Sequence, residues 1–297
     1  MPYPARFYAA IHRGTPGDLE HYQRMCQNAS SVLELGCGYG RVVAALAAPA
    51  RQVVGVDNDP DRLAMAAKTV ATLAPDHRAG VELVEGDMRT VDLGHRFDRI
   101  LLPFGGLYCL LDDADLHATL TTVARHLAPG GRVGLDVYRA DEFHHDSEPD
   151  DLPEDAHTTL GRIEVDGIAY EVLERSTWDK TRQRIDASYL HVDETGHAIE
   201  GTIAQRYLLE DQLRAALARA GLTITRLSGA FDTSPPGQLT PNRRGDDTAA
   251  DAAPVHSSPS QAAPEDHAPD DADPTTQSEL MVVEAAATKT AIDQGGG

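Results

Sequence analysis

The sequence has 297 residues, 41% of them hydrophobic, which is enough to bury the core of one large domain or of two modest ones. Its 47 acidic residues against 26 Lys and Arg give a formal net charge of -21, which argues against nucleic acid or an anionic membrane as partner and suits a cytoplasmic protein. The three cysteines have no metal-ligand spacing, residues 1–14 show no secretory signal, and no apolar run is long enough to span a bilayer.

In chain order, the first half of the sequence alternates apolar strands with helices. One of these helices has Asp112 or Asp113 as its expected N-cap and repeats apolar residues at helical spacing. Near-continuously apolar strands that alternate with helices are typical of a parallel sheet covered on both faces, so we expect an α/β fold. The expected strands are 31–35, 53–57, 81–87, 97–104 and 132–138, and the expected helices are 40–48, 60–74 and the one that starts at 112 or 113.

Residues 161–209 follow a different pattern, with strand-like runs rich in Ile, Val, Tyr and Thr. Predicted hairpin turns separate the runs, so we expect a small antiparallel sheet inserted into the α/β core. A helix at 210–221, ended by Gly221, and a strand at 222–228 then resume the core. The hairpin turns are expected at 166–167, 179–181 and 194–196.

Residues 234–278 are rich in Pro, Ala and Asp, and their only large apolar side chains are Leu239 and Val255. Such a segment cannot bury enough apolar surface to offset the entropy of ordering it, so we expect it to be disordered. The apolar run ELMVVEA that follows it predicts a strand. Because that strand needs a sheet to join, the segment is interpreted as an insert and not as a tail.

A glycine-rich turn follows the first strand in SVLELGCGYGR, with Glu34 ahead of Gly36, Gly38 and Gly40. A dinucleotide-binding turn would need a glycine where Arg41 stands. A phosphate-binding P-loop would need a Lys followed by Ser or Thr, which is absent. The spacing is E-x-G-x-G-x-G between a strand and a helix, where the backbone can approach a ligand closely.

The segment ELGCGYG resembles the first motif of the class I S-adenosylmethionine-dependent methyltransferases, and RFDRILLPF and LAPGGRV resemble two of their later motifs. The resemblance implies an α/β, Rossmann-like sheet that is mostly parallel, with an antiparallel last strand and an inserted antiparallel β cap. It implies S-adenosylmethionine as the cofactor. The implied domains are an N-terminal lid at 1–30, a cofactor-binding core at 31–140, the cap at 141–209, completion of the core at 210–233, the insert at 234–278 and the last strand with its tail at 279–297.

The resemblance also implies a role for each motif residue. Glu34 would face the methionine ammonium, Asp57 would bind both ribose hydroxyls, and Asp87 would accept from the adenine amino group while Met88 packs on the ring. Pro103 and Phe104 would line the cleft beside the transferred methyl group. The cofactor-binding residues expected on this basis are Glu34, Gly36, Cys37, Gly38, Gly40, Asp57, Asn58, Asp87, Met88, Pro103 and Phe104, with Tyr8 and Arg13 from the N-terminal segment.

The acceptor would lie between the core and the cap. The residues expected to contact it are Tyr108, Trp178, Tyr189, Arg206 and Tyr207. Any of these could instead pack in the interior, the N-terminal aromatic residues could simply anchor their segment, and the cap could be a homodimer interface instead of a lid. No catalytic residue is assigned, and His117, His126, His144 and His145 are interpreted as surface histidines.

The function that the sequence predicts is methyl transfer by direct displacement from S-adenosylmethionine to a nitrogen or oxygen of a small molecule. Two alternatives remain open. One is another transfer reaction on the same fold, such as aminopropyl transfer, and the other is a noncatalytic binding protein.

Overall fold

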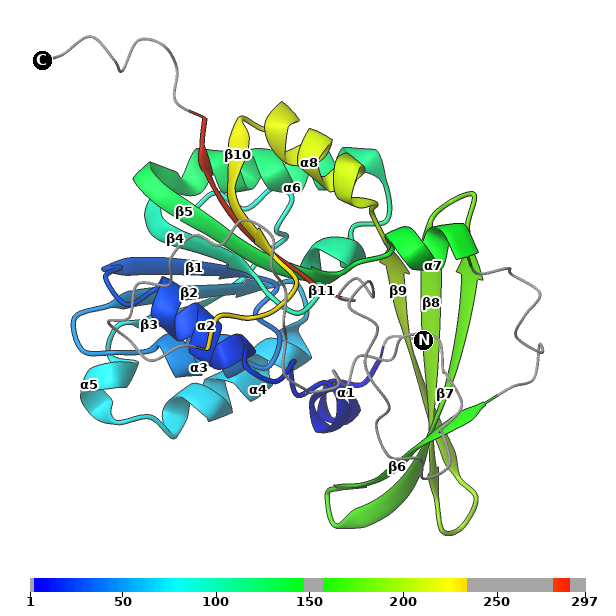
Figure 1. Ribbon diagram of the computed structural model, residues 1–297. Coiled ribbons are helices and arrows are strands. Elements are labelled where there is room, and N and C mark those ends of the chain that lie inside the picture. The colour runs from blue at the N-terminus through cyan, green and yellow to red at the C-terminus, as the bar shows by residue number, and fades with distance from the viewer. Residues whose placement is uncertain (1–2, 147–156, 234–279, 289–297) are drawn as a thin grey trace, which may run out of the picture.

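The computed structural model describes residues 3–146, 157–233 and 280–288 (Figure 1). The predicted disordered insert at 234–278 lies outside these residues. Two sheets make up the fold, a seven-stranded sheet with helices on both faces and a separate four-stranded sheet.

The seven-stranded sheet has the strand order β10-β11-β5-β4-β1-β2-β3. β11 pairs antiparallel with both β5 and β10, whereas the β1–β2, β1–β4, β2–β3 and β4–β5 pairs are parallel. The predicted mostly parallel sheet with an antiparallel last strand is therefore confirmed. Its strands are β1 (Ser31–Leu35), β2 (Gln52–Asp57), β3 (Val81–Glu85), β4 (Phe97–Leu102), β5 (Leu127–Tyr138), β10 (Leu222–Ser228) and β11 (Leu280–Ala287).

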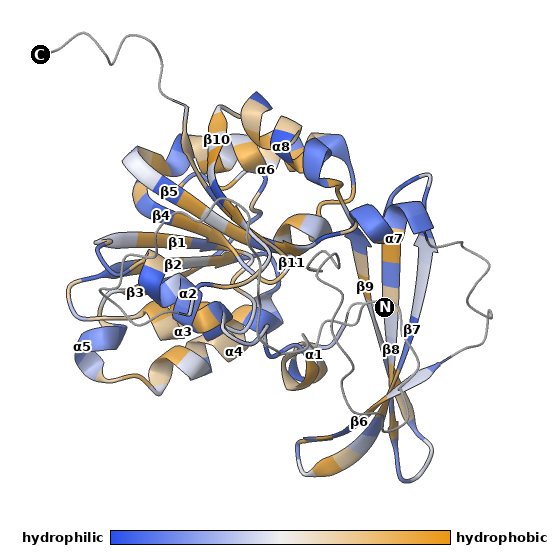
Figure 2. Cartoon of the chain, in the orientation of Figure 1, coloured by the Kyte–Doolittle hydropathy of each residue, from blue (hydrophilic) through white to orange (hydrophobic). Residues whose placement is uncertain are grey.

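Both faces of this sheet are buried, which is why its strands are nearly continuous apolar runs. Along β1, Leu33 and Leu35 belong to one hydrophobic cluster and Val32 belongs to another, because successive side chains of a strand point to opposite faces. Figure 2 shows hydrophobic residues along the central strands, whereas α5 and α7 are largely hydrophilic.

Helices α2, α3 and α4 cover one face of the sheet, and α6 and α8 cover the other (Figure 1). Asp112 is the N-cap of α6, since its side chain accepts from the backbone N–H of Asp115. None of the helices in the described part of the chain is long and apolar enough to cross a membrane. The helices are α1 (Ala5–Ile11), α2 (Asp18–Met25), α3 (Arg41–Leu46), α4 (Pro60–Ala71), α5 (Pro75–Arg78), α6 (Asp113–His126), α7 (Asp141–Asp146) and α8 (Glu210–Arg219), with a 3-10 helix η1 (Gly106–Cys109).

Several predicted boundaries are wrong by a few residues, among them those of one helix and of the fifth strand. The helix expected to reach residue 74 ends at Ala71, because Pro75 forces the preceding Ala74 into an extended conformation. The strand expected to begin at 132 begins at Leu127, which pairs with Phe97 across a register shift. Residues 127–131, which precede the predicted strand, are therefore part of β5.

The four-stranded cap sheet consists of β6 (Thr158–Val165), β7 (Ile168–Asp179), β8 (Arg184–Asp193) and β9 (Ala198–Arg206), paired antiparallel in sequence order. The three predicted hairpin turns lie between these strands. At the first, Asp166 and Gly167 both have positive φ, 54° and 78°, as a tight two-residue hairpin turn requires. The predicted antiparallel insertion between β5 and α8 is confirmed.

The short helix α1 connects the cap to the core. On the cap side, Phe7 packs edge-on against Tyr170, and the Tyr3 hydroxyl is hydrogen-bonded to His191 Nε2 at 3.0 Å. On the core side, the Arg62 guanidinium of α4 lies 4.2 Å from the centre of the Tyr8 ring. The N-terminal aromatic residues therefore hold the cap and the core together. This agrees with the alternative in which they anchor their own segment.

Asp98 of β4 generates a stability prediction. Its carboxylate accepts from the N–H groups of Ser30 and Ser31 at 2.8 and 3.1 Å and from the Ser30 hydroxyl at 2.7 Å, and these hydrogen bonds lower its pKa. A lowered folded-state pKa stabilises the fold above the unfolded pKa, and this stabilisation is lost as the pH falls through the folded value. We expect Asp98→Asn to lower the free energy of unfolding by about 1–2 kcal/mol at pH 7 and by little near pH 2.

Urea unfolding followed by circular dichroism at both pH values measures this difference. Glu82→Gln, at an exposed position of β3, is the control and should change stability little at either pH. An equal loss for Asp98→Asn at pH 7 and pH 2 would contradict an electrostatic origin.

Candidate active site

A cleft of about 390 Å³ lies at the carboxyl ends of β1, β2 and β4. Ligands bind at this edge in open α/β sheets, because the turns that follow successive parallel strands meet there. The cleft is lined by all of the expected cofactor residues except Gly40 and Arg13, namely Tyr8, Glu34, Gly36, Cys37, Gly38, Asp57, Asn58, Asp87, Met88, Pro103 and Phe104.

Glu34 is the most deeply buried acid of the cleft, with 3% of its surface exposed. Its Oε2 atom has no hydrogen-bond partner within the described residues, and burial raises its pKa to about 8. A buried carboxylate oxygen without a partner is costly unless a ligand satisfies it. An ammonium group in the cleft would do so, which fits the methionine end of S-adenosylmethionine.

Backbone hydrogen bonds to β2 fix the position of the glycine turn. The N–H groups of Gly36 and Cys37 both donate to the Val56 carbonyl of β2. Gly36 and Gly38 have φ of 77° and 54°, which side-chain-bearing residues rarely adopt. A Cβ atom on Gly38 would meet nothing within 4 Å, so open space lies above the turn where a ligand can approach the backbone.

Gly40 has a different role from the one expected. It precedes α3 with φ of 81°, and a Cβ atom there would lie 2.9 Å from the Cβ of Ala66 in α4. The residue therefore allows α3 and α4 to pack closely instead of lining the cleft.

Asp57 at the end of β2 both supports the turn and lines the cleft. Its two carboxylate oxygens accept from the N–H groups of Gly38 at 2.7 Å and Asp59 at 2.9 Å. Each carboxylate oxygen can accept more than one hydrogen bond, so both remain able to accept from a ribose diol. Binding of the ribose by Asp57 stays a prediction.

Asp87, expected at the adenine, is paired with a residue that the sequence motifs did not single out. Arg89 Nε donates to both Asp87 oxygens at 2.9 Å, and its NH1 donates to both oxygens of Asp115 at 2.8 and 2.9 Å. The hydrogen bonds from Arg89 lower the pKa of Asp87 and keep it ionised as an acceptor. All three side chains line the cleft.

The cations of the cleft are Arg41, Arg62 and Arg89, whereas Arg13 is exposed and donates to the Ala10 carbonyl. Asp18 of α2 holds the Arg41 guanidinium, with NH1 and Oδ1 2.8 Å apart. Arg41 is thus placed beside the glycine turn, where it can meet a carboxylate. Its only sequence signal was its position, where a dinucleotide-binding turn would have a glycine.

The wall after β4 contains a backbone conformation that is unusual for an aromatic residue. Phe104 has φ of 54°, and its N–H donates to Asp136 Oδ1 at 2.9 Å. The Tyr22 hydroxyl donates to the same oxygen, and the N–H of Gly105 donates to the Asp136 carbonyl. Sequence reasoning missed Asp136 and Tyr22, since neither belongs to a motif and they lie 114 residues apart.

Two of the expected acceptor residues are interior residues instead. Tyr108 is fully buried and its hydroxyl donates to the Tyr138 and Leu208 carbonyls, both at 3.0 Å. Tyr207 is also fully buried, and its hydroxyl is hydrogen-bonded to His144 Nδ1 at 2.8 Å. Trp178 packs edge-on against Phe143. These three residues join the cap to the core, and none of them lines the cleft.

Tyr189 is also fully buried and does not line the cleft, but its ring contacts a residue that does. Its ring lies 5.1 Å from that of His12, which lines the cleft and is also 6.2 Å from the Phe104 ring. No motif of the sequence assigned His12 a role. The surface interpretation of His126 is wrong: it is 1% exposed and its Nε2 accepts from the N–H of Leu93.

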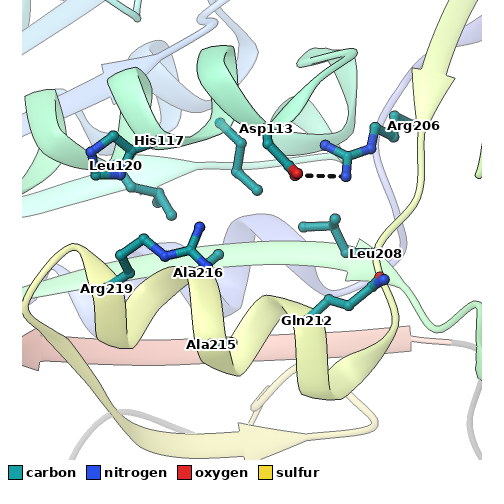
Figure 3. A pocket seen from close by; sticks show the side chains of 10 residues that line it. Asp113, His117, Leu120, Arg206, Leu208, Gln212, Ala215, Ala216 and Arg219 are labelled. Atoms are coloured by element: carbon teal, nitrogen blue, oxygen red, sulfur yellow. Dashed lines mark hydrogen bonds and ion pairs between the residues drawn. The ribbon is translucent and has the colours of Figure 1, made fainter.

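Arg206, the last of the expected acceptor residues, lines a second hollow between α6 and α8 (Figure 3). Its NH2 donates to Asp113 Oδ1 at 2.7 Å. The cofactor cleft and this hollow share no lining residue.

A glycine turn with a buried acid before it, and further acids after the next two strands, defines a protein that binds a nucleoside-like cofactor at its sheet edge. The family model described as a methyltransferase domain matches residues 32–131. A cypemycin N-terminal methyltransferase from Streptomyces sp. is 31% identical over 209 residues, 69% of this chain and 77% of that protein. The chain belongs to the class I S-adenosylmethionine-dependent methyltransferases.

Two other similarities extend beyond the methyltransferase domain matched at residues 32–131. A dTDP-3-amino-3,6-dideoxy-alpha-D-glucopyranose N,N-dimethyltransferase from Streptomyces fradiae is 26% identical over 238 residues, 76% of this chain and 86% of that protein. The solved structure of the CcbJ methyltransferase from Streptomyces caelestis has a TM-score of 0.68 and 21% identity, over 97% of this chain and 99% of that one. The second likeness shows that the whole fold is shared, the cap included.

Asp57→Ala tests the cofactor site. We expect the variant to bind S-adenosylmethionine at least about 100-fold more weakly than the wild type, because it loses a charged acceptor and the support of Gly38. Calorimetric titration measures the dissociation constants. Asp61→Ala, on the exposed side of α4, is the control, and thermal unfolding verifies that each variant folds. Unchanged binding by folded Asp57→Ala would exclude Asp57 from the site.

Tyr22→Phe tests whether Asp136 positions Phe104. Loss of one hydrogen bond of about 1 kcal/mol should weaken cofactor binding roughly fivefold, since Phe104 forms part of the cleft wall. Tyr170→Phe removes a hydroxyl from the hydrophobic face of the cap and should leave cofactor binding unchanged. Equal affinities in the two variants would contradict this role of Asp136.

Proposed function

We propose that the protein methylates an amino group of a small polar acceptor, with amino sugars as the best-supported class. Two relatives support a nitrogen acceptor by name, one acting on an aminodideoxyglucose and the other on a peptide N-terminus. The likeness to the sugar enzyme covers 238 residues, whereas the matched methyltransferase domain spans 32–131. It therefore includes segments outside the cofactor core, where an acceptor would bind.

The observation that carries this proposal is the group of side chains between the cleft and the cap. His12 is in ring contact with Phe104 on the cleft side and with Tyr189 on the cap side. Glu174 of β7 is directly opposite Tyr189 of β8, is 6% exposed, and accepts from the Ser176 hydroxyl at 3.0 Å. Aromatic rings and a carboxylate are groups that stabilise positive charge.

Positive charge develops on the acceptor when the acceptor is an amine. S-adenosylmethionine supplies a methyl group already activated by its positively charged sulfur. The acceptor nitrogen bonds to the methyl carbon as the carbon–sulfur bond breaks and its electron pair passes to sulfur. The nitrogen is then cationic and loses a proton, and we assign its acceptance to the imidazole of His12, which lines the cleft. The Glu174 carboxylate stabilises the charge on nitrogen as it forms.

The alternative of aminopropyl transfer is less well supported. A decarboxylated cofactor has no carboxylate for Arg41, which Asp18 holds in the cleft wall. A cofactor that retains its carboxylate gives the Arg41 guanidinium an anionic partner.

An acceptor screen tests the proposal. Purified protein and S-adenosylmethionine are incubated with matched pairs of amino sugars and the corresponding hydroxyl sugars, free and as nucleoside diphosphate derivatives, and methylated products are identified by mass spectrometry. Mono- and dimethylation of amines alone is the expected result. Methylation of the hydroxyl sugars and not of the amines would overturn the proposal.

Glu174→Gln tests the role of the cap carboxylate. We expect kcat for the amine acceptor to fall about 10- to 100-fold, because the variant no longer stabilises charge on nitrogen, while the dissociation constant of S-adenosylmethionine stays unchanged. Glu171→Gln is the matched control, since Glu171 is an exposed glutamate on the other face of the same strand. Similar kcat values for both variants would exclude Glu174 from the reaction.

A further inference from the structure

We propose that the hollow between α6 and α8 binds a phosphoryl group, and that this group is the phosphate of the acceptor. The second part rests on the proposed function, with a phosphorylated amino sugar such as a nucleoside diphosphate derivative as substrate. Binding of a phosphoryl group in the hollow does not depend on the proposed function.

The hollow has a volume of about 190 Å³ and lies where the chain passes from the cap back into the core (Figure 3). Leu116 and Leu120 of α6 and Ala216 of α8 form its apolar floor. Arg206, the last residue of β9, and Arg219, the last residue of α8, extend toward it from opposite ends. The space suits an anionic group and not a whole nucleotide, since drug-sized ligands occupy pockets of about 300–1,000 Å³.

Arg206 provides the strongest indication of a ligand. Its side chain is 14% exposed, and one terminal nitrogen donates to Asp113 Oδ1 at 2.7 Å. The other terminal nitrogen, NH1, is buried and has no hydrogen-bond partner in the described part of the chain. A phosphoryl oxygen would give NH1 a hydrogen-bond partner while NH2 stays paired with Asp113, and guanidinium N–H groups are strong donors to phosphate.

The other charges of the hollow also favour an anion. Arg219 forms no ion pair within residues 3–146, 157–233 and 280–288, and His117 of α6 adds an imidazole. Asp113 is the acid among the lining residues, and it neutralises one of the two guanidinium groups. The hollow is thus cationic in a chain whose formal net charge is -21. The negative net charge of the protein repels anions, so a site that binds an anion needs positive charge nearby.

The position of the hollow connects it to the acceptor. Asp113 lines the hollow and Asp115 lines the cofactor cleft, so the first turn of α6 separates the two. Arg206 belongs to β9, which pairs with β8, the strand of Tyr189. The proposal requires an acceptor held beneath the cap to extend past the start of α6 into the hollow. The aminodideoxyglucose relative acts on a dTDP-linked sugar, whose diphosphate needs such a partner.

The first experiment titrates inorganic phosphate into the full-length protein, followed by nuclear magnetic resonance or calorimetry. We expect millimolar binding to the wild type that weakens at least tenfold in Arg219→Gln, which is exposed and should not affect folding. Arg214→Gln is the matched control, because Arg214 lies on α8 outside the hollow and is paired with Glu210. No binding to the wild type, or equal binding to both variants, overturns the proposed site. This outcome does not depend on methyl transfer.

The second experiment compares a nucleoside diphosphate amino sugar with the free amino sugar as acceptors. In Arg219→Gln, KM for the diphosphate acceptor should rise about tenfold with kcat unchanged, while KM for the free sugar stays the same. The variant could lose phosphate binding and yet show equal changes in KM for the two acceptors. That result would mean that the hollow binds free phosphate, and it would overturn the link to the acceptor. If neither acceptor is methylated, the proposed function fails, and the titration still decides whether the hollow binds phosphate.

Discussion

The central position of β1 is the constraint on which the cleft depends. β1 is hydrogen-bonded to β2 on one side and to β4 on the other, and both of its faces are buried. The chain cannot continue straight beyond Leu35, so it turns at glycines that need positive φ. Because all three strands are parallel, the turn, Asp57 and the wall at Phe104 meet at one edge.

The N-terminal segment stabilises that edge from two sides. From α2, Asp18 holds Arg41, and Tyr22 donates to the same Asp136 oxygen that accepts from the Phe104 N–H. From α1, aromatic residues pack on the cap sheet. Residues before the first strand thus position both the cofactor wall and the cap, so the segment is part of the site as well as an anchor.

Charge is distributed unevenly over the molecule, in a way that matches the chemistry. The cofactor carries positive charge on its sulfur, and the buried acid Glu34 lines the cleft, while Glu174 is buried in the cap. The hollow between α6 and α8 is instead lined by two arginines, which fits the proposed binding of a phosphate group there. The acidic residues and the cationic hollow thus lie in separate parts of the molecule.

The sequence pattern alone predicted the alternation of strands and helices and the cap hairpins, because local periodicity follows from backbone geometry. Half of the residues that line the cleft were predicted from the resemblance to the methyltransferase motifs. The folded structure was needed to show which arginines line the cleft, that Gly40 allows two helices to pack closely, and that Tyr108 and Tyr207 are interior residues. It also paired Asp136 with Tyr22 and placed Arg206 in a separate hollow. These outcomes depend on contacts between residues far apart in the chain, which no local pattern records.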